Sequence, residues 1–116
     1  MAVGDLGSLI SISTWLTATA SRNQIAQVAP GIYAYANATG SGAGAAVIIW
    51  TYSISAAGVI TAIDNQTLTT GPGTIAGWTS CVRISGTVFA VMVRRTTPNN
   101  GMWVTTVNIN ADGTIG

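Results

Sequence analysis

Residues 25–61 read IAQVAPGIYAYANATGSGAGAAVIIWTYSISAAGVIT, and residues 81–116 repeat them in altered form as CVRISGTVFAVMVRRTTPNNGMWVTTVNINADGTIG. Five pairs of similar residues lie 56 positions apart: Ile25 and Cys81, Val28 and Ile84, Ile32 and Val88, Tyr33 and Phe89, and Ala34 and Ala90. After the intervening loop, three pairs lie 55 positions apart: Ile54 and Ile109, Gly58 and Gly113, and Ile60 and Ile115. A period of this length is typical of solenoids, propellers and arrays, in which each repeat is one supersecondary unit. We therefore expect residues 1–116 to form a single domain of two related units, about 4–61 and about 62–116.

The composition indicates an all-β chain. Gly, Thr, Ser and β-branched residues occur in every segment, and no long stretch keeps the 3.6-residue apolar period of a helix. Turn signals such as Pro30-Gly31, Ser85-Gly86 and Asp112-Gly113 separate short apolar runs. We expect antiparallel strands at about 8–14, 24–29, 31–38 and 45–55 in the first repeat, and at about 62–69, 79–85, 87–95 and 102–110 in the second.

The run from Val88 to Val93 is apolar at every position, so both faces of this predicted strand are apolar. Such a strand is expected at the centre of a sheet that is covered on both sides. Val107 and Ile109 instead alternate with Thr and Asn, which predicts a strand with one wet face.

Four antiparallel strands in a unit of 55 or 56 residues, with apolar positions on both faces, are typical of a β-propeller blade. The residues add a resemblance to a family. The closing segment WVTTVNINADGTIG, followed in a ring by a segment like GSLIS, resembles the tandem repeats of uncharacterised bacterial, archaeal and viral β-propellers, which carry a Gly-Trp strand, a Thr-rich strand and an Asp-Gly-Thr-Ile hairpin. The first copy departs from this motif, since Ile48 replaces Trp103 and Ala57 replaces Asp112. The resemblance implies a propeller fold and carries no characterised activity.

Two blades cannot close a ring, because propellers typically contain four to eight. Residues 112–116 end just after a hairpin turn, and residues 4–10 continue such a hairpin as residues 58–63 do inside the chain. We therefore predict two four-stranded antiparallel blades per chain, completed to a closed propeller by head-to-tail homo-oligomerisation. A trimer of six blades is favoured over a tetramer of eight. A two-blade fragment or an engineered reconstruction of a longer propeller would give the same pattern.

The side chains that catalysis and metal binding require are scarce. The chain has four Arg, three Asp and one Cys, and it lacks His, Lys and Glu, so the usual catalytic triads cannot form. Residues 108–113 match the first half of a calcium loop, but they hold a single carboxylate and are better explained as a two-residue Asp-Gly hairpin turn. We expect no enzymatic activity, no catalytic residue, no cofactor and no metal. Cys81, the counterpart of Ile25, is expected to be a buried apolar residue.

The charge and hydropathy patterns exclude two classes of partner. A net charge of +1 is too small for the phosphate neutralisation on which nucleic-acid binding depends. The longest apolar runs are far shorter than the roughly 18 residues of a membrane-spanning helix. We therefore expect neither nucleic acid nor a membrane as a partner, and the low charge favours self-association.

Two features remain as candidates for ligand binding. The polar segment 94–101 occurs once, because its first-repeat counterpart is rich in glycine, and it is either a solvated loop or a binding loop. The tryptophans either pack between sheets or stack on a sugar ring. The candidate ligand-binding residues are Arg94, Arg95, Asn99, Asn100, Trp50 and Trp103. The preferred function is a non-enzymatic self-assembling scaffold for binding or structure. The alternatives are a glycan-binding, lectin-like propeller and a structural component of a particle or surface layer.

Overall fold

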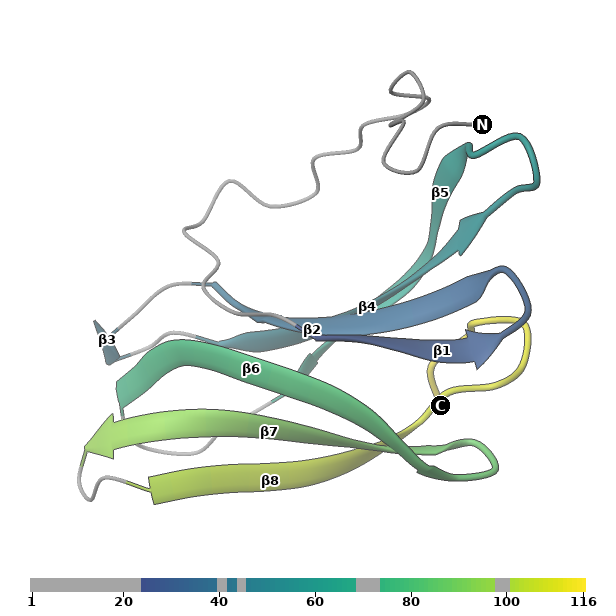
Figure 1. Cartoon of the computed structure of the whole chain (residues 1–116). Coiled ribbons are helices and arrows are strands. Elements are labelled where there is room, and N and C mark those ends of the chain that lie inside the picture. The colour runs from purple at the N-terminus through teal and green to yellow at the C-terminus, as the bar shows by residue number, and fades with distance from the viewer. Residues whose placement is uncertain (1–23, 40–41, 44–45, 69–73, 98–100) are drawn as a thin grey trace, which may run out of the picture.

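The computed structural model describes residues 24–39, 42–43, 46–68, 74–97 and 101–116. These residues form two antiparallel sheets that lie one above the other (Figure 1). The described part of the chain contains no helix, and so none that could span a membrane. The all-β prediction is therefore confirmed.

Sheet A has the strand order β1-β2-β4-β5, and sheet B has the order β3-β6-β7-β8. The strands of sheet A are β1 (Ile25–Ala29), β2 (Ile32–Ala38), β4 (Val47–Ile54) and β5 (Ile60–Leu68). The strands of sheet B are β3 (Gly42–Ala43), β6 (Thr74–Ser85), β7 (Val88–Thr97) and β8 (Gly101–Asn108). Seven of the eight expected strands are confirmed in place, and the expected strand at 8–14 lies outside the described residues.

The internal repeat extends to the pairing register. The β1–β2 pairs recur in β6–β7 at a separation of 56 on both strands, and the β2–β4 pairs recur in β7–β8 at separations of 56 and 55. Three matches illustrate this: Ala26↔Ala34 with Val82↔Ala90, Ala29↔Ile32 with Ser85↔Val88, and Tyr33↔Tyr52 with Phe89↔Val107. A register is fixed by which side chains must face the core. The two copies therefore share one backbone design, as the sequence period indicates.

The grouping of the strands differs from the prediction that the strand at 62–69 opens the second unit. β5 pairs with β4 along its length and is the last strand of sheet A. The reason is the tight hairpin after β4, in which Gly58, at a φ of 79°, donates its N–H to the carbonyl of Ser55. A hairpin this short must join neighbouring antiparallel strands.

The turn at Asp112-Gly113 is a hairpin, but it is longer than the predicted two-residue turn. The N–H of Asn110 donates to the carbonyl of Thr114, and the N–H of Gly113 donates to the carbonyl of Asn110. This closes a three-residue loop whose last residue, Gly113, has a φ of 90°. The hairpin after β4 has the same hydrogen bonds with Ala57 in place of Asp112, so the glycine rather than the Asp defines the turn.

The hydrophobic core lies between the two sheets. Alternation along each strand sends every second side chain into it, and Phe89, Val91 and Val93 of β7 are fully buried there. Sheet A contributes Ala26, Val28, Ala34, Ala36, Ala38, Val47, Ile49 and Leu68, and sheet B contributes Cys81, Phe89, Val91, Val93, Val107 and Ile109. The predictions that Cys81 is buried and that β7 lies inside its sheet are confirmed. Among the described residues only one face of β7 is covered, since Met92 lies on the face that points away from sheet A.

Candidate functional site

The two sheets stack through faces that are not equivalent in the repeat. Sheet A turns toward the core the face that holds Ala34, Val47 and Ile49. The counterparts of these residues in sheet B, at 90, 102 and 104, lie on its outer face, because Phe89, Val91 and Val93 alternate with that set and point inward. The chain therefore buries the face of sheet A that holds Ala34 against the face of sheet B that holds Phe89. The counterpart of each buried face, on the other sheet, lies on the outside.

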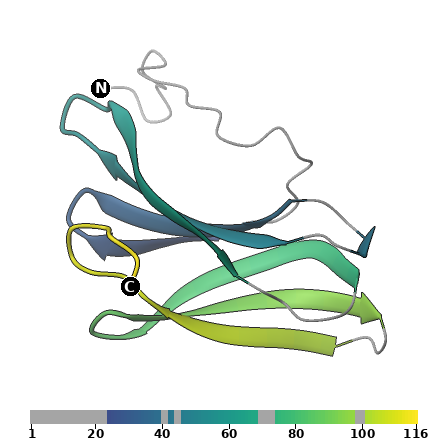
Figure 2. The same ribbon diagram turned by 180° about the vertical axis from the view of Figure 1, so that it is seen from behind.

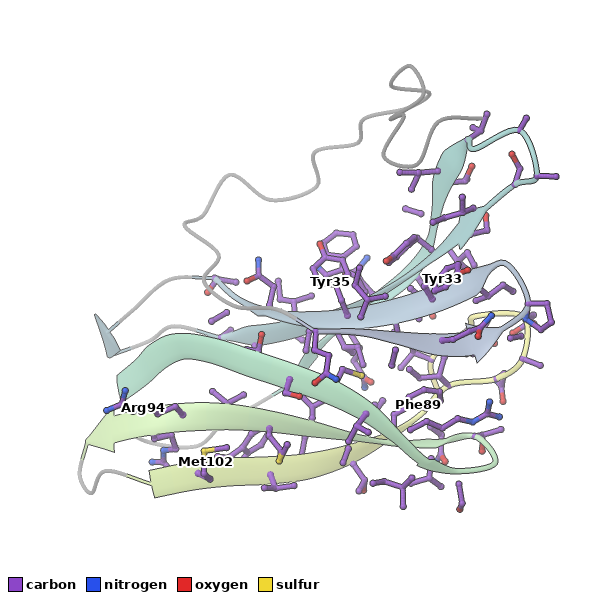
Figure 3. All side chains as sticks on the ribbon, viewed as in Figure 1. Tyr33, Tyr35, Phe89, Arg94 and Met102 are labelled. Atoms are coloured by element: carbon purple, nitrogen blue, oxygen red, sulfur yellow. The ribbon has the colours of Figure 1, made fainter. Side chains whose placement is uncertain are left out.

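The outer face of sheet A is rich in aromatic residues, and we call it the tyrosine face. It holds Ile25, Tyr33, Tyr35, Asn37, Ile48, Trp50 and Tyr52, and the register also places Gln27, Asn65 and Thr67 on it. Tyr33 and Tyr35 project from β2 away from sheet B, whereas Phe89 lies between the sheets (Figure 3). The Tyr33 and Tyr52 rings stack with centroids 5.8 Å apart, and the Tyr35 ring meets Tyr52 edge-on at 6.0 Å. The tyrosine face is thus an ordered aromatic surface.

Two tyrosines and one asparagine of the tyrosine face are partly or fully shielded from solvent. Burial raises the pKa of Tyr35, and burial followed by the nearby Tyr35 and Tyr33 raises the pKa of Tyr52. Asn37 is 2 % exposed, and its side-chain oxygen has no hydrogen-bond partner among the described residues. A buried acceptor without a partner is uncommon in native proteins and calls for a physical explanation.

The outer face of sheet B is mainly aliphatic, and we call it the methionine face. Its apolar members are Val82, Ile84, Val88, Ala90, Met92, Met102 and Val104, and the register also places Ser80, Arg94, Thr106 and Asn108 on it. Met102, Ile84 and Val104 are 63 %, 60 % and 56 % exposed. Contiguous apolar side chains on a surface mark sites of interaction. The methionine face is the counterpart of the face that sheet A buries.

The C-terminal hairpin crosses from sheet B to sheet A, as the view from behind also shows (Figure 2). The hydroxyl of Thr51 on β4 donates to the carbonyl of Gly113 at 2.6 Å, and the N–H of Ile115 donates to the Oδ2 carboxylate oxygen of Asp64 on β5 at 2.9 Å. A Cβ atom at Gly113 would lie 2.7 Å from the Cδ1 atom of Ile63. This hairpin therefore fits closely over the edge formed by β4 and β5.

The two sheets are also joined through β6. The hydroxyl of Thr79 donates to the carbonyl of Ala36 at 2.6 Å, and Arg83 donates to the carbonyl of Val28 at 3.2 Å. The Arg83 guanidinium also lies 5.8 Å from the centre of the Phe89 ring. Polar contacts on both sides of the core thus fix how the two sheets stack.

The predicted ligand-binding residues fall in three different places. Arg94 and Arg95 are consecutive near the end of β7, with Arg94 exposed beside Met102 and Arg95 half-buried opposite Gly101. Trp103 packs against the core between the sheets, whereas Trp50 is half-buried on the tyrosine face of the other sheet. Asn99 and Asn100 lie outside the described residues. The structure therefore places the two arginine side chains on opposite faces of sheet B and the two tryptophans on different sheets.

Sequence reasoning did not identify the tyrosine and methionine faces as a candidate site. The signal was present, since the repeat aligns Tyr33 with Phe89 and the alternation defines which positions share a face. What the sequence alone did not supply was which face of each sheet turns inward.

The remaining reactive groups are few. Burial raises the pKa of the Cys81 thiol to about 11, so the thiol is protonated at neutral pH. Within the described residues, no three His, Cys, Asp or Glu side chains gather to hold a metal ion.

The chain matches no family model, no curated protein and no solved structure. The two outer faces are therefore interpreted from their own geometry.

Proposed function

We propose that the protein is a non-enzymatic scaffold that assembles head-to-tail with copies of itself, the tyrosine face of one chain covering the methionine face of the next. The observation that carries the proposal is the repeat relationship of the faces. The methionine face is the counterpart of the face that sheet A buries, and the tyrosine face is the counterpart of the face that sheet B buries. The interface between chains would therefore repeat the interface within the chain.

A head-to-tail contact is favoured over a two-fold one. Inside the chain each type of face packs against the other type, and neither packs against itself. A two-fold dimer would place tyrosine face on tyrosine face, or methionine face on methionine face. A head-to-tail contact closes into a ring when the rotation per chain divides a full turn, and three chains would give a propeller of six sheets.

A further property supports self-association. A net charge of +1 provides little electrostatic repulsion between copies. In the part of the chain that the structure describes, no observation favours the glycan-binding alternative over the scaffold.

The experiment compares two single charges. Val104→Glu places a carboxylate in the methionine face, and Ala111→Glu places one in an exposed turn outside both faces. Sedimentation equilibrium should give a dissociation constant at least about tenfold higher for Val104→Glu, because burying a carboxylate requires its desolvation. Ala111→Glu should associate like the wild type. Equal association of all three proteins would contradict the proposal. Unchanged denaturant midpoints would show that both variants fold.

A further inference from the structure

The hairpins that follow β4 and β8 are two copies of one structure. They occupy residues 55–59 and 110–114, a separation of 55. In each hairpin, the first residue donates its N–H to the carbonyl of the fifth residue, and its own carbonyl accepts the N–H of the glycine at the fourth position. These glycines, Gly58 and Gly113, have φ angles of 79° and 90°. The two hairpins therefore present the same backbone groups to whatever they pack on.

The hairpin at 110–114 attaches to sheet A through its glycine. The carbonyl of Gly113 accepts a hydrogen bond from the hydroxyl of Thr51 at 2.6 Å. A Cβ atom at Gly113 would lie 3.2 Å from the Cγ2 atom of Ile32, so the glycine rests close to this side chain. Thr51 is fully buried, and Ile32 packs against the core. The receiving surface is therefore a Thr on β4 and an Ile on the neighbouring strand β2.

The hairpin at 55–59 points the other way. It rises from sheet A away from sheet B, whereas the hairpin at 110–114 reaches from sheet B toward sheet A (Figures 1 and 2). Ile54, which precedes it, is 37 % exposed, although the counterpart Ile109 is 1 % exposed. The described residues form no third sheet on this side. Within that part of the chain, the hairpin at 55–59 therefore has no receiving surface like that of its counterpart.

A second receiving surface of the same kind lies on the methionine face. The counterparts of Thr51 and Ile32 are Thr106 on β8 and Val88 on β7, which are neighbouring strands. Thr106 is exposed, and Val88 is half-buried. Both lie on the side of sheet B that faces away from sheet A. The chain therefore carries one hairpin and one receiving surface that match each other but lie on opposite sides of the molecule.

We infer that the hairpin at 55–59 of one copy docks on the methionine face of the next copy, where the Thr106 hydroxyl donates a hydrogen bond to the carbonyl of Gly58. This bond repeats between chains the one that Thr51 donates to Gly113 within the chain. The inference rests on the proposed self-assembly, and it fixes how the tyrosine face is positioned on the methionine face. A head-to-tail contact of this kind uses a different surface of each partner.

The repeat also assigns which hairpin residues the docking covers. Ile54 becomes covered, because Ile109 is buried in the equivalent position. Val59 stays in solvent, because its counterpart Thr114 is exposed although the hairpin that contains it is docked. Val59 is 52 % exposed and Ile54 is 37 % exposed. The less exposed of the two side chains is therefore the one that should contribute to association.

Two substitutions of Thr106 test the hydrogen bond. Thr106→Val removes the hydroxyl and leaves the carbonyl of Gly58 without this donor in the interface. Sedimentation equilibrium should give a dissociation constant about fivefold or more above that of the wild type. Thr106→Ser keeps the hydroxyl and should stay within about twofold of the wild type. The expectation for Thr106→Val is specific, because an added methyl group on an apolar interface without this bond would leave association unchanged or tighten it.

Two substitutions of the hairpin test which residues it buries. Ile54→Ala should raise the dissociation constant by at least about fivefold, because apolar surface is lost from the docked side. Val59→Ala is the matched control in the same hairpin and should change the constant by less than about twofold. Denaturation curves establish that each variant is folded under the conditions of the measurement.

Three results would overturn the inference. One is an unchanged or lower dissociation constant for Thr106→Val, or a loss of the same size for Thr106→Ser. Another is an equal effect of Ile54→Ala and Val59→Ala. Either result leaves the proposed function standing if Val104→Glu still weakens association. The third is a wild-type chain that does not self-associate, which would overturn the proposed function as well.

Discussion

The hydroxyl of Thr51 on β4 donates a 2.6 Å hydrogen bond to the carbonyl of Gly113, 62 residues away in the hairpin that follows β8. Both residues are buried. Thr51→Val keeps the shape of the side chain but removes its hydroxyl, so the buried carbonyl of Gly113 loses this hydrogen-bond donor. We expect the free energy of unfolding to fall by about 1–3 kcal/mol, measured by chemical denaturation.

The repeat supplies the control for this substitution. Thr106 is the counterpart of Thr51 on the outer face of sheet B and is exposed. Measured at a protein concentration below that of self-association, Thr106→Val should change the unfolding free energy by less than about 0.5 kcal/mol. Equal effects of the two substitutions would show that the Thr51 hydrogen bond contributes nothing specific.

Glycines 113 and 86 provide a second matched comparison, because both have positive φ, at 90° and 50°. A Cβ atom at Gly113 would lie 2.7 Å from Ile63 and 3.2 Å from Ile32, whereas one at Gly86 would meet nothing within 4 Å. Gly86→Ala should cost about 1 kcal/mol for the left-handed backbone alone. Gly113→Ala should cost more than Gly86→Ala, because its Cβ atom would also press on the Cγ2 atoms of Ile32 and Ile63, at 3.2 and 3.3 Å. Thermal denaturation of the two variants measures the difference, and equal losses would contradict the close fit of the hairpin.

Phe89 and Tyr33 occupy the same position in the two repeats but opposite environments. Phe89 is fully buried in the core, and Tyr33 is half-buried on the tyrosine face. Phe89→Ala should destabilise the fold by about 3–5 kcal/mol through the cavity it leaves. Tyr33→Ala should destabilise the isolated chain by less and should weaken self-association instead. Denaturation and sedimentation together separate these outcomes, and a larger folding loss for Tyr33→Ala would contradict the assignment of inner and outer faces.

The thiol of Cys81 should make stability depend on alkaline pH. Burial raises its pKa from 9.0 to about 11, so the folded thiol stays protonated in a range where the unfolded thiol ionises. Unfolding then releases a proton, and stability should fall as pH rises from 9 toward 11 by up to about 1.4 kcal/mol per pH unit. The unfolding free energies of the wild type and Cys81→Ala are compared between pH 9 and 10. Their difference isolates the contribution of this thiol, because tyrosine ionisation affects both proteins equally. Parallel pH profiles would contradict the burial of the thiol.

The sequence predicts the strands well because alternation and turn residues are local signals. Seven strands and the hairpin glycines follow from the spacing of residues such as Gly58 and Gly113. The assignment of β5 to sheet A was missed because a period fixes the length of a unit and leaves open which strand begins it. Its position follows from pairing with β4, a non-local contact.

The candidate site was harder to predict for a related reason. Tyr33 and Phe89 are both apolar positions of equivalent strands, and nothing in their local sequence distinguishes an outer from an inner face. Only the stacking of the sheets separates them, burying Phe89 and leaving Tyr33 on the outside. Trp103 was a candidate ligand contact for the same reason, and in the structure it packs against the core.

Native mass spectrometry of the wild-type chain at about 10 µM shows whether copies of the chain assemble, since copies that bury apolar faces of this kind should associate at micromolar concentration. We expect a closed oligomer with a mass of three times the 11.8 kDa chain. A mass of one chain at this concentration, from a protein that unfolds cooperatively, would contradict it.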